Sequence, residues 1–203
     1  MNRFRTIALT AVTGFVLVAC GPAASGGSQE PGKSEAAASQ AQASGDGVQP
    51  SFTEGAVADL EALIPNTVGE MTLQKVSTKG DEFIASADSD PAVAKFIEDL
   101  GVSPGDISLA FGFGVSADAS SSIAMFVFRA SGADTDRLVA AFKEANDADR
   151  DAPLVWSGTS VGGKSVETAV DAAQTLYLYA KDDVLFFVSG DPASTEEAIS
   201  ELP

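Results

Sequence analysis

Residues 158–165, GTSVGGKS, match the Gly-x-x-x-x-Gly-Lys-Ser pattern of a nucleotide-binding P-loop. In a P-loop, glycine amides and the start of a following helix cradle phosphate, the lysine meets the outer phosphate oxygens, and the hydroxyl holds Mg²⁺. Here a strand is expected on both sides of Gly162-Gly163, because two glycines suit the positive φ angles of a tight hairpin turn. We therefore predict a hairpin at this position and no nucleotide-binding residues.

The residue types that the chain lacks limit the kinds of catalysis it could perform. The chain has no histidine and one cysteine, and Ser-x-x-Lys does not occur, so the common Ser-His, Cys-His and Ser-Lys nucleophile systems are excluded. Carboxylate pairs could support hydrolysis of glycosidic bonds. However, Asp81-Glu82 and Asp182-Asp183 fall on predicted turns, where charge serves solubility. We predict no enzyme activity, no catalytic residues and no cofactor.

One acidic segment has the spacing of a calcium loop. Asp147, Asp149 and Asp151 alternate, which would let their carboxylates converge on Ca²⁺. Ala152 stands where such a loop needs glycine, and Arg150 opposes cation binding. The segment is therefore a weak calcium candidate, and the alternative interpretation is a polar exit from a helix.

Three aromatic residues could form a ligand surface. Trp156 precedes the Gly-Gly turn, and Tyr177 and Tyr179 are two residues apart on a later predicted strand. If the two strands were neighbours, these rings could form one patch. The alternative, which we favour, is that they cover helices as part of the core.

The first twenty residues carry the most specific signal. Arg3 and Arg5 precede an uncharged, mostly apolar run that ends in Leu17-Val18-Ala19-Cys20. This segment resembles a bacterial prolipoprotein signal with its lipobox. The resemblance implies cleavage before Cys20, which would carry the diacylglycerol and further acyl chains such as palmitate. We expect residues 1–19 to be a signal peptide and Cys20 to be the lipidation site.

Composition agrees with a domain held near a membrane by lipid. The net charge is −17, and without residues 1–19, which hold two arginines and no acid, ten cations face 29 acids, or −19. Such a surface repels nucleic acid, which we exclude as a partner. Residues 21–50 consist mainly of Gly, Ala, Ser, Gln and Pro, and we interpret them as a disordered tether of roughly 30 Å.

The length of residues 51–203 and their pattern of apolar residues predict one globular domain. A capping box over 51–54 predicts a short helix that Pro65 stops. Asp90-Pro91 and Gly101 bound a second helix, Asp134 begins a third, and Asp191-Pro192 begin a fourth. Strands are predicted at 72–76, 82–87, 107–115, 123–130, on both sides of Gly162-Gly163, at 175–180 and at 184–189.

Two of these predicted strands differ in how apolar residues are distributed between their two faces. Ile107, Leu109, Phe111, Phe113 and Val115 alternate with small residues, which predicts that the large residues face the core. Residues 123–130, IAMFVFRA, are apolar on both faces and so suit the interior of a sheet.

Two segments of the domain show a weak internal sequence similarity. A shift of 101 residues places KVSTKGDEFIASADSDPA over LYLYAKDDVLFFVSGDPA, so that two predicted turns and two Asp-Pro caps coincide. This could reflect duplication or two uses of one hairpin-to-helix solution. We predict an α+β domain with a mainly antiparallel sheet, helices on one face and two hairpin–helix pseudo-repeats at 73–100 and 174–201.

Together these features predict a lipid-anchored, extracytoplasmic lipoprotein of the cell envelope. Its partners are expected to be the membrane, through the lipid on Cys20, and an envelope protein or a small apolar ligand. The favoured function is a non-catalytic binding or interaction module. Two alternatives stay open: a carrier that holds an apolar ligand on the large-residue face of 107–115, and a wall hydrolase with a carboxylate pair.

Overall fold

The computed structural model describes residues 51–86, 91–148, 150–171 and 174–203, which all belong to one compact unit. The expected signal peptide, Cys20 and the tether lie outside these residues. None of the described helices has the length and apolar composition needed to cross a membrane.

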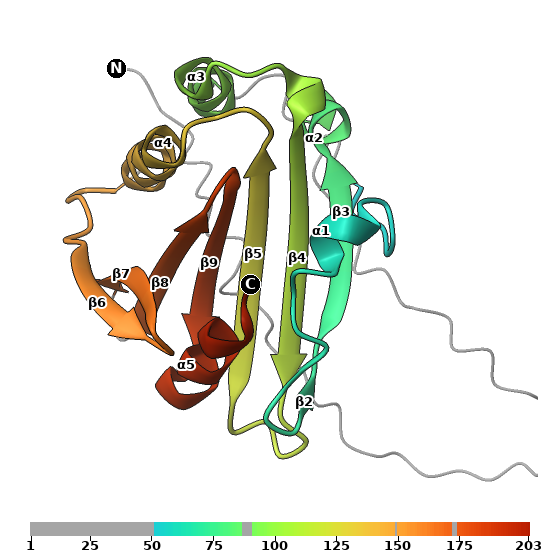
Figure 1. Cartoon of the computed structure of the whole chain (residues 1–203), viewed down its shortest axis with the longest axis vertical. Helices are drawn as coiled ribbons and strands as arrows, with labels where there is room; N and C mark the ends of the chain where they lie inside the picture. The colour runs from blue at the N-terminus through green and yellow to red at the C-terminus, as the bar shows by residue number, and fades with distance from the viewer. Residues whose placement is uncertain (1–50, 87–90, 149, 172–173) are drawn as a thin grey trace, which may run out of the picture. The chain divides into compact units, whose positions relative to one another are not determined.

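A seven-stranded sheet forms the centre of the domain (Figure 1). Its strand order is β3-β4-β5-β9-β8-β7-β6, and every neighbouring pair is antiparallel. The strands are β3 (Gln74–Lys79), β4 (Ile107–Val115), β5 (Ser122–Ala130), β6 (Ser157–Val161), β7 (Lys164–Asp171), β8 (Gln174–Lys181) and β9 (Val184–Gly190). A separate small ladder joins β1 (Thr67–Val68) to β2 (Met71–Thr72). The predicted α+β class with a mainly antiparallel sheet is confirmed.

Helices cover both faces of this sheet, not the single face that we expected. They are α1 (Ala58–Glu61), α2 (Gly80–Ser86), α3 (Pro91–Leu100), α4 (Thr135–Asp147) and α5 (Pro192–Glu201), with a 3-10 turn η1 (Pro104–Asp106). Ile123, Met125 and Val127 of β5 pack with α1 and α5. Phe128 and Ala130 of the same strand pack with α3 and α4. Because successive side chains of a strand point to opposite faces, these are two cores on two sides of one sheet.

The helix termini follow the predicted caps. Helix α3 begins at Pro91 and ends before Gly101, whose φ of 68° is the left-handed conformation common after helices. The Asp134 carboxylate accepts the amides of Asp136 and Arg137 at the start of α4. Asp191 accepts the amide of Ser194 at the start of α5, and this bond lowers the pKa of Asp191.

The capping box predicted at 51–54 does not form. Helix α1 starts instead after Val57, which has no side-chain cap, and Thr53 pairs with Ser77 of the edge strand β3 as an isolated bridge. The Ser77 hydroxyl donates to the Glu61 carboxylate at 2.6 Å and accepts the Val57 amide at 2.7 Å. Pairing with β3 therefore replaces the local cap.

The strand predicted at 82–87 is wrong, as is the turn at Lys79-Gly80-Asp81. Helix α2 begins at Gly80, directly at the end of β3, and its Phe83 and Ile84 pack against the core beneath α3. Space explains the difference: a Cβ on Gly80 would lie 2.3 Å from the Pro104 carbonyl oxygen and 2.6 Å from the Ile107 Cβ. The chain at Gly80 therefore packs tightly against the η1–β4 segment and continues as helix α2, not as a second strand along the free edge of β3.

The predicted pseudo-repeat is also wrong, because it required the hairpin that does not form around Gly80. Residues 174–181 and 184–190 do form a hairpin followed by a helix at Pro192, and a helix does begin at Pro91. The first unit, however, is a single strand followed by two helices. The shared Asp-Pro signals therefore mark two helix starts and not a repeated unit.

Strand β4 buries its small residues from Ala110 to Gly114 and its large residues only at one end. Ala110, Gly112 and Gly114 are all buried, whereas Phe113 is 38% exposed and Val115 is 54% exposed. A Cβ on Gly112 would lie 2.8 Å from the Ile64 Cγ2, so the absence of side chains lets the segment after α1 approach the strand closely. The prediction that the large residues of β4 face the core holds only for Ile107 and Leu109.

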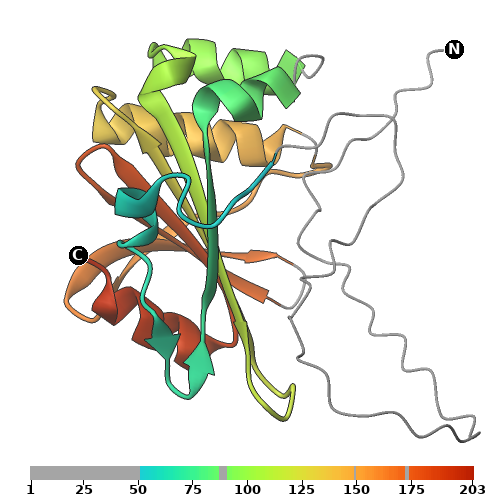
Figure 2. The ribbon, with the colours of Figure 1, turned by 90° about the vertical axis from the view of Figure 1, so that its right-hand side faces the viewer.

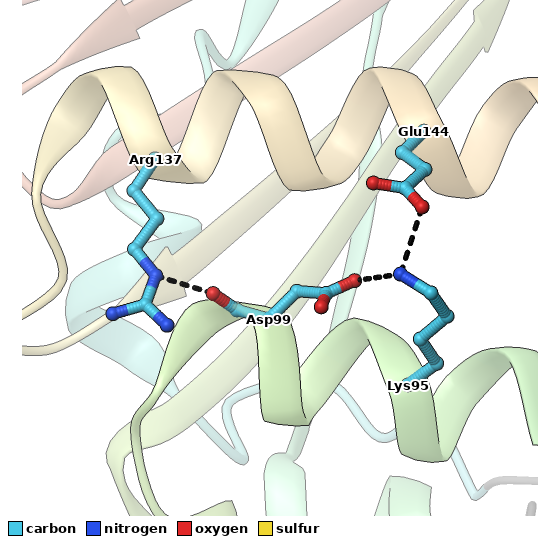
Figure 3. A network of polar contacts seen from close by, with 4 residues as sticks. All are labelled: Lys95, Asp99, Arg137 and Glu144. Carbon is cyan, nitrogen blue, oxygen red and sulfur yellow. Dashed lines mark hydrogen bonds and ion pairs between the residues drawn. The ribbon is translucent and has the colours of Figure 1, made fainter.

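A polar cluster joins α3 to α4 (Figure 3). Lys95 bridges Asp99 at 2.5 Å and Glu144 at 2.7 Å, and these acids raise the pKa of Lys95. Arg137 Nε donates to the Asp99 carbonyl oxygen. Because these groups are exposed, their main role is to set the helices' register, while apolar packing supplies most of the stability.

We expect Gly112→Val to lower the free energy of unfolding by about 2 kcal/mol, because the added carbons would overpack the contact with Ile64. Gly158→Val is the matched control, since a Cβ on this strand glycine meets nothing within 4 Å. Urea unfolding of the two variants would measure the difference. Equal stability would contradict the close approach of Ile64 to β4.

Candidate functional site

The P-loop-like segment is the β6–β7 hairpin. Gly162 and Gly163 form its turn with φ angles of 57° and 78°, and β7 follows at once, as the sequence predicted. The Lys164 ammonium donates to the Ser200 carbonyl oxygen of α5 at 2.9 Å. A Cβ on Gly162 would lie 2.6 Å from the Ser200 Cβ. The glycine and the lysine thus fasten the hairpin tip to α5, and a strand occupies the place of the helix that a P-loop requires.

Lys164→Met should therefore leave nucleotide affinity unchanged. We expect calorimetric titration with Mg-ATP to give no saturable heat for the wild type or the variant. The variant should unfold at slightly lower urea because the bond to Ser200 is lost. Micromolar ATP binding that disappears in Lys164→Met would refute the hairpin interpretation.

The acidic segment after α4 makes structural contacts. An Asp147 carboxylate oxygen accepts the Leu154 amide at 2.9 Å, and the Arg150 guanidinium pairs with Asp171 at 2.9 Å. Asp149 lies outside the described residues, and Asp151 is exposed. In the described part of the chain, no three acidic, histidine or cysteine side chains gather as a metal site would require.

The two carboxylate pairs lie on different kinds of element. Asp182-Asp183 form the β8–β9 turn, as predicted, and Asp182 has a φ of 55°. Asp81-Glu82 lie instead in the first turn of α2, where negative charge suits the helix dipole.

The three aromatic residues lie on opposite faces of the sheet. Trp156 packs with the α3–α4 core, and the Lys143 ammonium lies 5.5 Å from the centre of its ring. Tyr177 and Tyr179 pack with the α1–α5 core, where the Tyr179 hydroxyl donates to the Pro203 carbonyl oxygen at 2.9 Å. The interpretation as core residues is confirmed, and the single patch does not form.

A first candidate surface lies where α3 and α4 no longer cover the sheet. We call it the phenylalanine face; it consists of Val76, Phe111, Phe113, Val115 and Phe126. Phe111 lies opposite both Val76 and Phe126 in the register, so the row crosses three strands. Phe111 and Phe113 stack with ring centres 6.1 Å apart. Figure 2 shows α2, α3 and α4 gathered at one end of the strands, which leaves the other end of this face without a helix.

A second candidate surface is a groove on the opposite face, between β6–β8 and α5. Its volume is about 690 Å³. We call it the hydroxyl groove, after the side chains that line it: Ser157, Thr159, Thr168, Thr175, Tyr177 and Glu196. Ser157 lies opposite Thr168, and Thr168 lies opposite Tyr177, so three hydroxyl-bearing residues form a row across three adjacent strands.

Tyr177 is the buried member of that row. The residue as a whole is only 6% exposed, while its hydroxyl is not among the buried atoms without a partner and is accessible at the groove. Burial raises the pKa of Tyr177, and the negative charge of Glu196 raises it further. The phenol is therefore neutral at physiological pH and can both donate and accept a hydrogen bond.

Neither surface could be read from the sequence pattern. Alternation in β4 identified the phenylalanines but assigned them to the core. The hydroxyl groove depends on the pairing register of the strands, which brings together residues 157, 168 and 177.

No protein-family model, curated protein or solved structure matches this chain.

Proposed function

We propose that the protein is a lipid-anchored, extracytoplasmic interaction module that holds a partner protein of the cell envelope against its phenylalanine face. The observation that carries this proposal is the partial exposure of Phe113 and Val115 beside the half-buried Phe111 and Phe126. Aromatic side chains of this kind anchor protein interfaces, because they bury much apolar area with few rotatable bonds.

The chain's own tether is a poor occupant for this face. Residues 21–50 contain no Leu, Ile, Met, Phe, Trp or Tyr, so they have no large side chain to pack between the phenylalanines. A separate partner with apolar side chains fits better.

The charge of the protein limits the kinds of partner segment that could bind. Seven of the described lysines and arginines are engaged within the fold: Lys75, Lys95, Arg129, Arg137, Lys143, Arg150 and Lys164. The acids far outnumber the cations in the chain, so the protein as a whole presents a negatively charged surface to a partner. We expect an apolar partner segment with neutral or basic flanks.

The alternatives fit less well. A carrier would enclose its apolar ligand, whereas the phenylalanine face is an open strand surface and the hydroxyl groove has a polar lining. A wall hydrolase of the usual kind needs two facing carboxylates, and among the described residues Glu196 is the one carboxylate that lines the groove.

The anchor has its own test. Cys20→Ala should leave the precursor without acyl chains and uncleaved by the lipoprotein signal peptidase, so it should lose the lipoprotein's behaviour in detergent phase partition. Mass spectrometry of the mature N-terminus provides the second measurement. If wild type and variant partition alike and are processed at the same bond, the lipoprotein proposal is wrong.

The binding face can be tested by photocrosslinking in cells. A benzophenone amino acid in place of Phe113 should give a discrete crosslinked protein band, because that side chain would lie inside the interface. The control is the same substitution at Val170, which is 67% exposed on the opposite face.

The crosslinking outcomes separate the functions. A band at position 113 that is absent at 170 and weakened by Phe111→Ser supports the interaction module. Crosslinks to lipid alone would favour the carrier instead. Equal crosslinking from both positions would contradict a specific face.

A further inference from the structure

The geometry points to a second binding site: the hydroxyl groove takes a neutral saccharide segment. This inference does not depend on the proposed interaction module, because the groove lies on the α1–α5 side of the sheet and the phenylalanine face on the α3–α4 side.

The spacing of the hydroxyls is the first argument. The row from Ser157 through Thr168 to Tyr177 crosses three adjacent strands about 4.8 Å apart, and the Ser157 and Thr168 hydroxyl oxygens lie 3.4 Å from each other. Thr159 and Thr175 add a hydroxyl on either side of this row. Hydroxyls both donate and accept hydrogen bonds, which suits a ligand that itself carries closely spaced hydroxyls.

Tyr177 supplies an independent sign of a ligand. Most of its side chain is buried, but its hydroxyl is not among the buried atoms that lack a partner, so the oxygen is accessible at the groove and bonds to none of the described residues. By contrast, the hydroxyl of Tyr179, two residues later on the same strand, bonds to Pro203. An accessible hydroxyl that makes no bond within the fold can bond to a ligand in place of water.

Glu196 defines the class of ligand. Its carboxylate can accept two hydrogen bonds from neighbouring hydroxyls, and its charge repels phosphate and other anions. A polar lining disfavours an apolar ligand, and a volume of about 690 Å³ lies within the range of about 300–1,000 Å³ for small-molecule sites. A neutral oligosaccharide satisfies all of these conditions.

The walls of the groove are fixed in place before a ligand binds. The β6–β7 tip rests on α5 through the contact of Gly162 with Ser200 and the bond from Lys164. The start of α5 is held by the Asp191 cap. Such a preformed site loses little conformational entropy on binding.

The experiment uses residues 20–203 with Cys20→Ser, so that no lipid is attached. The protein is applied to an array of neutral oligosaccharides that includes glucans, mannans, galactans and N-acetylglucosamine oligomers. The strongest binder is then titrated by calorimetry. We expect saturable binding that Tyr177→Phe and Glu196→Gln each weaken about threefold to tenfold, the effect of one lost hydrogen bond.

Two matched controls identify the site. Tyr179→Phe removes a hydroxyl from the same strand and face, and Glu201→Gln removes an exposed charge from the same helix; neither residue lines the groove. Both should bind within twofold of the parent. Tyr177→Phe should also unfold at the parent's urea midpoint, because its hydroxyl has no partner to lose within the described fold.

Three results would overturn the inference. The first is that no oligosaccharide on the array binds. The second is binding that neither Tyr177→Phe nor Glu196→Gln weakens. The third is binding of the cationic probe spermidine, lost in Glu196→Gln, without binding of any saccharide, which would make the groove a cation site.

Discussion

Strands β5 and β9 carry apolar side chains on both of their faces, and this requires cover on both sides of the sheet. Phe186 and Val188 point to the α1–α5 side, while Leu185 and Phe187 point to the α3–α4 side. The helices meet this requirement, and in the described part of the chain they lie before, between and after the strands. The two cores are therefore built from residues distant in sequence, and β4, β5, β8 and β9 contribute side chains to both of them.

Local signals in the sequence located most elements but not their environments. The caps at Asp134 and Asp191 were readable because each is a bond between neighbours in the chain. The α2 segment was not, because the space around Gly80 is filled by Pro104 and Ile107, some twenty-five residues away. The same limit applies to β4: alternation separates large from small residues, but only the elements packed across the strand decide which row is buried.

The two candidate surfaces share a geometric origin. A strand of nine residues such as β4 or β5 is about 30 Å long, whereas a helix is about 10 Å wide. Helices α3 and α4, which run across the strands, therefore cover one end of their face and leave the phenylalanines at the other (Figure 2). On the opposite side, α5 contacts β5, β9, β8 and β6, and the hydroxyl groove lies between this helix and strands β6 to β8.

The sheet ends in two edge strands, and their composition matters for molecules crowded together on one membrane. Edge β3 is partly covered where Thr53 pairs with Ser77. Edge β6 is five residues long, and its SGTSV sequence is exposed at its first four positions. An unpaired edge can template the addition of strands from other copies, which leads to aggregation. Because β6 is short and mostly small and polar, such pairing would bury little apolar area, and neighbouring copies can remain separate.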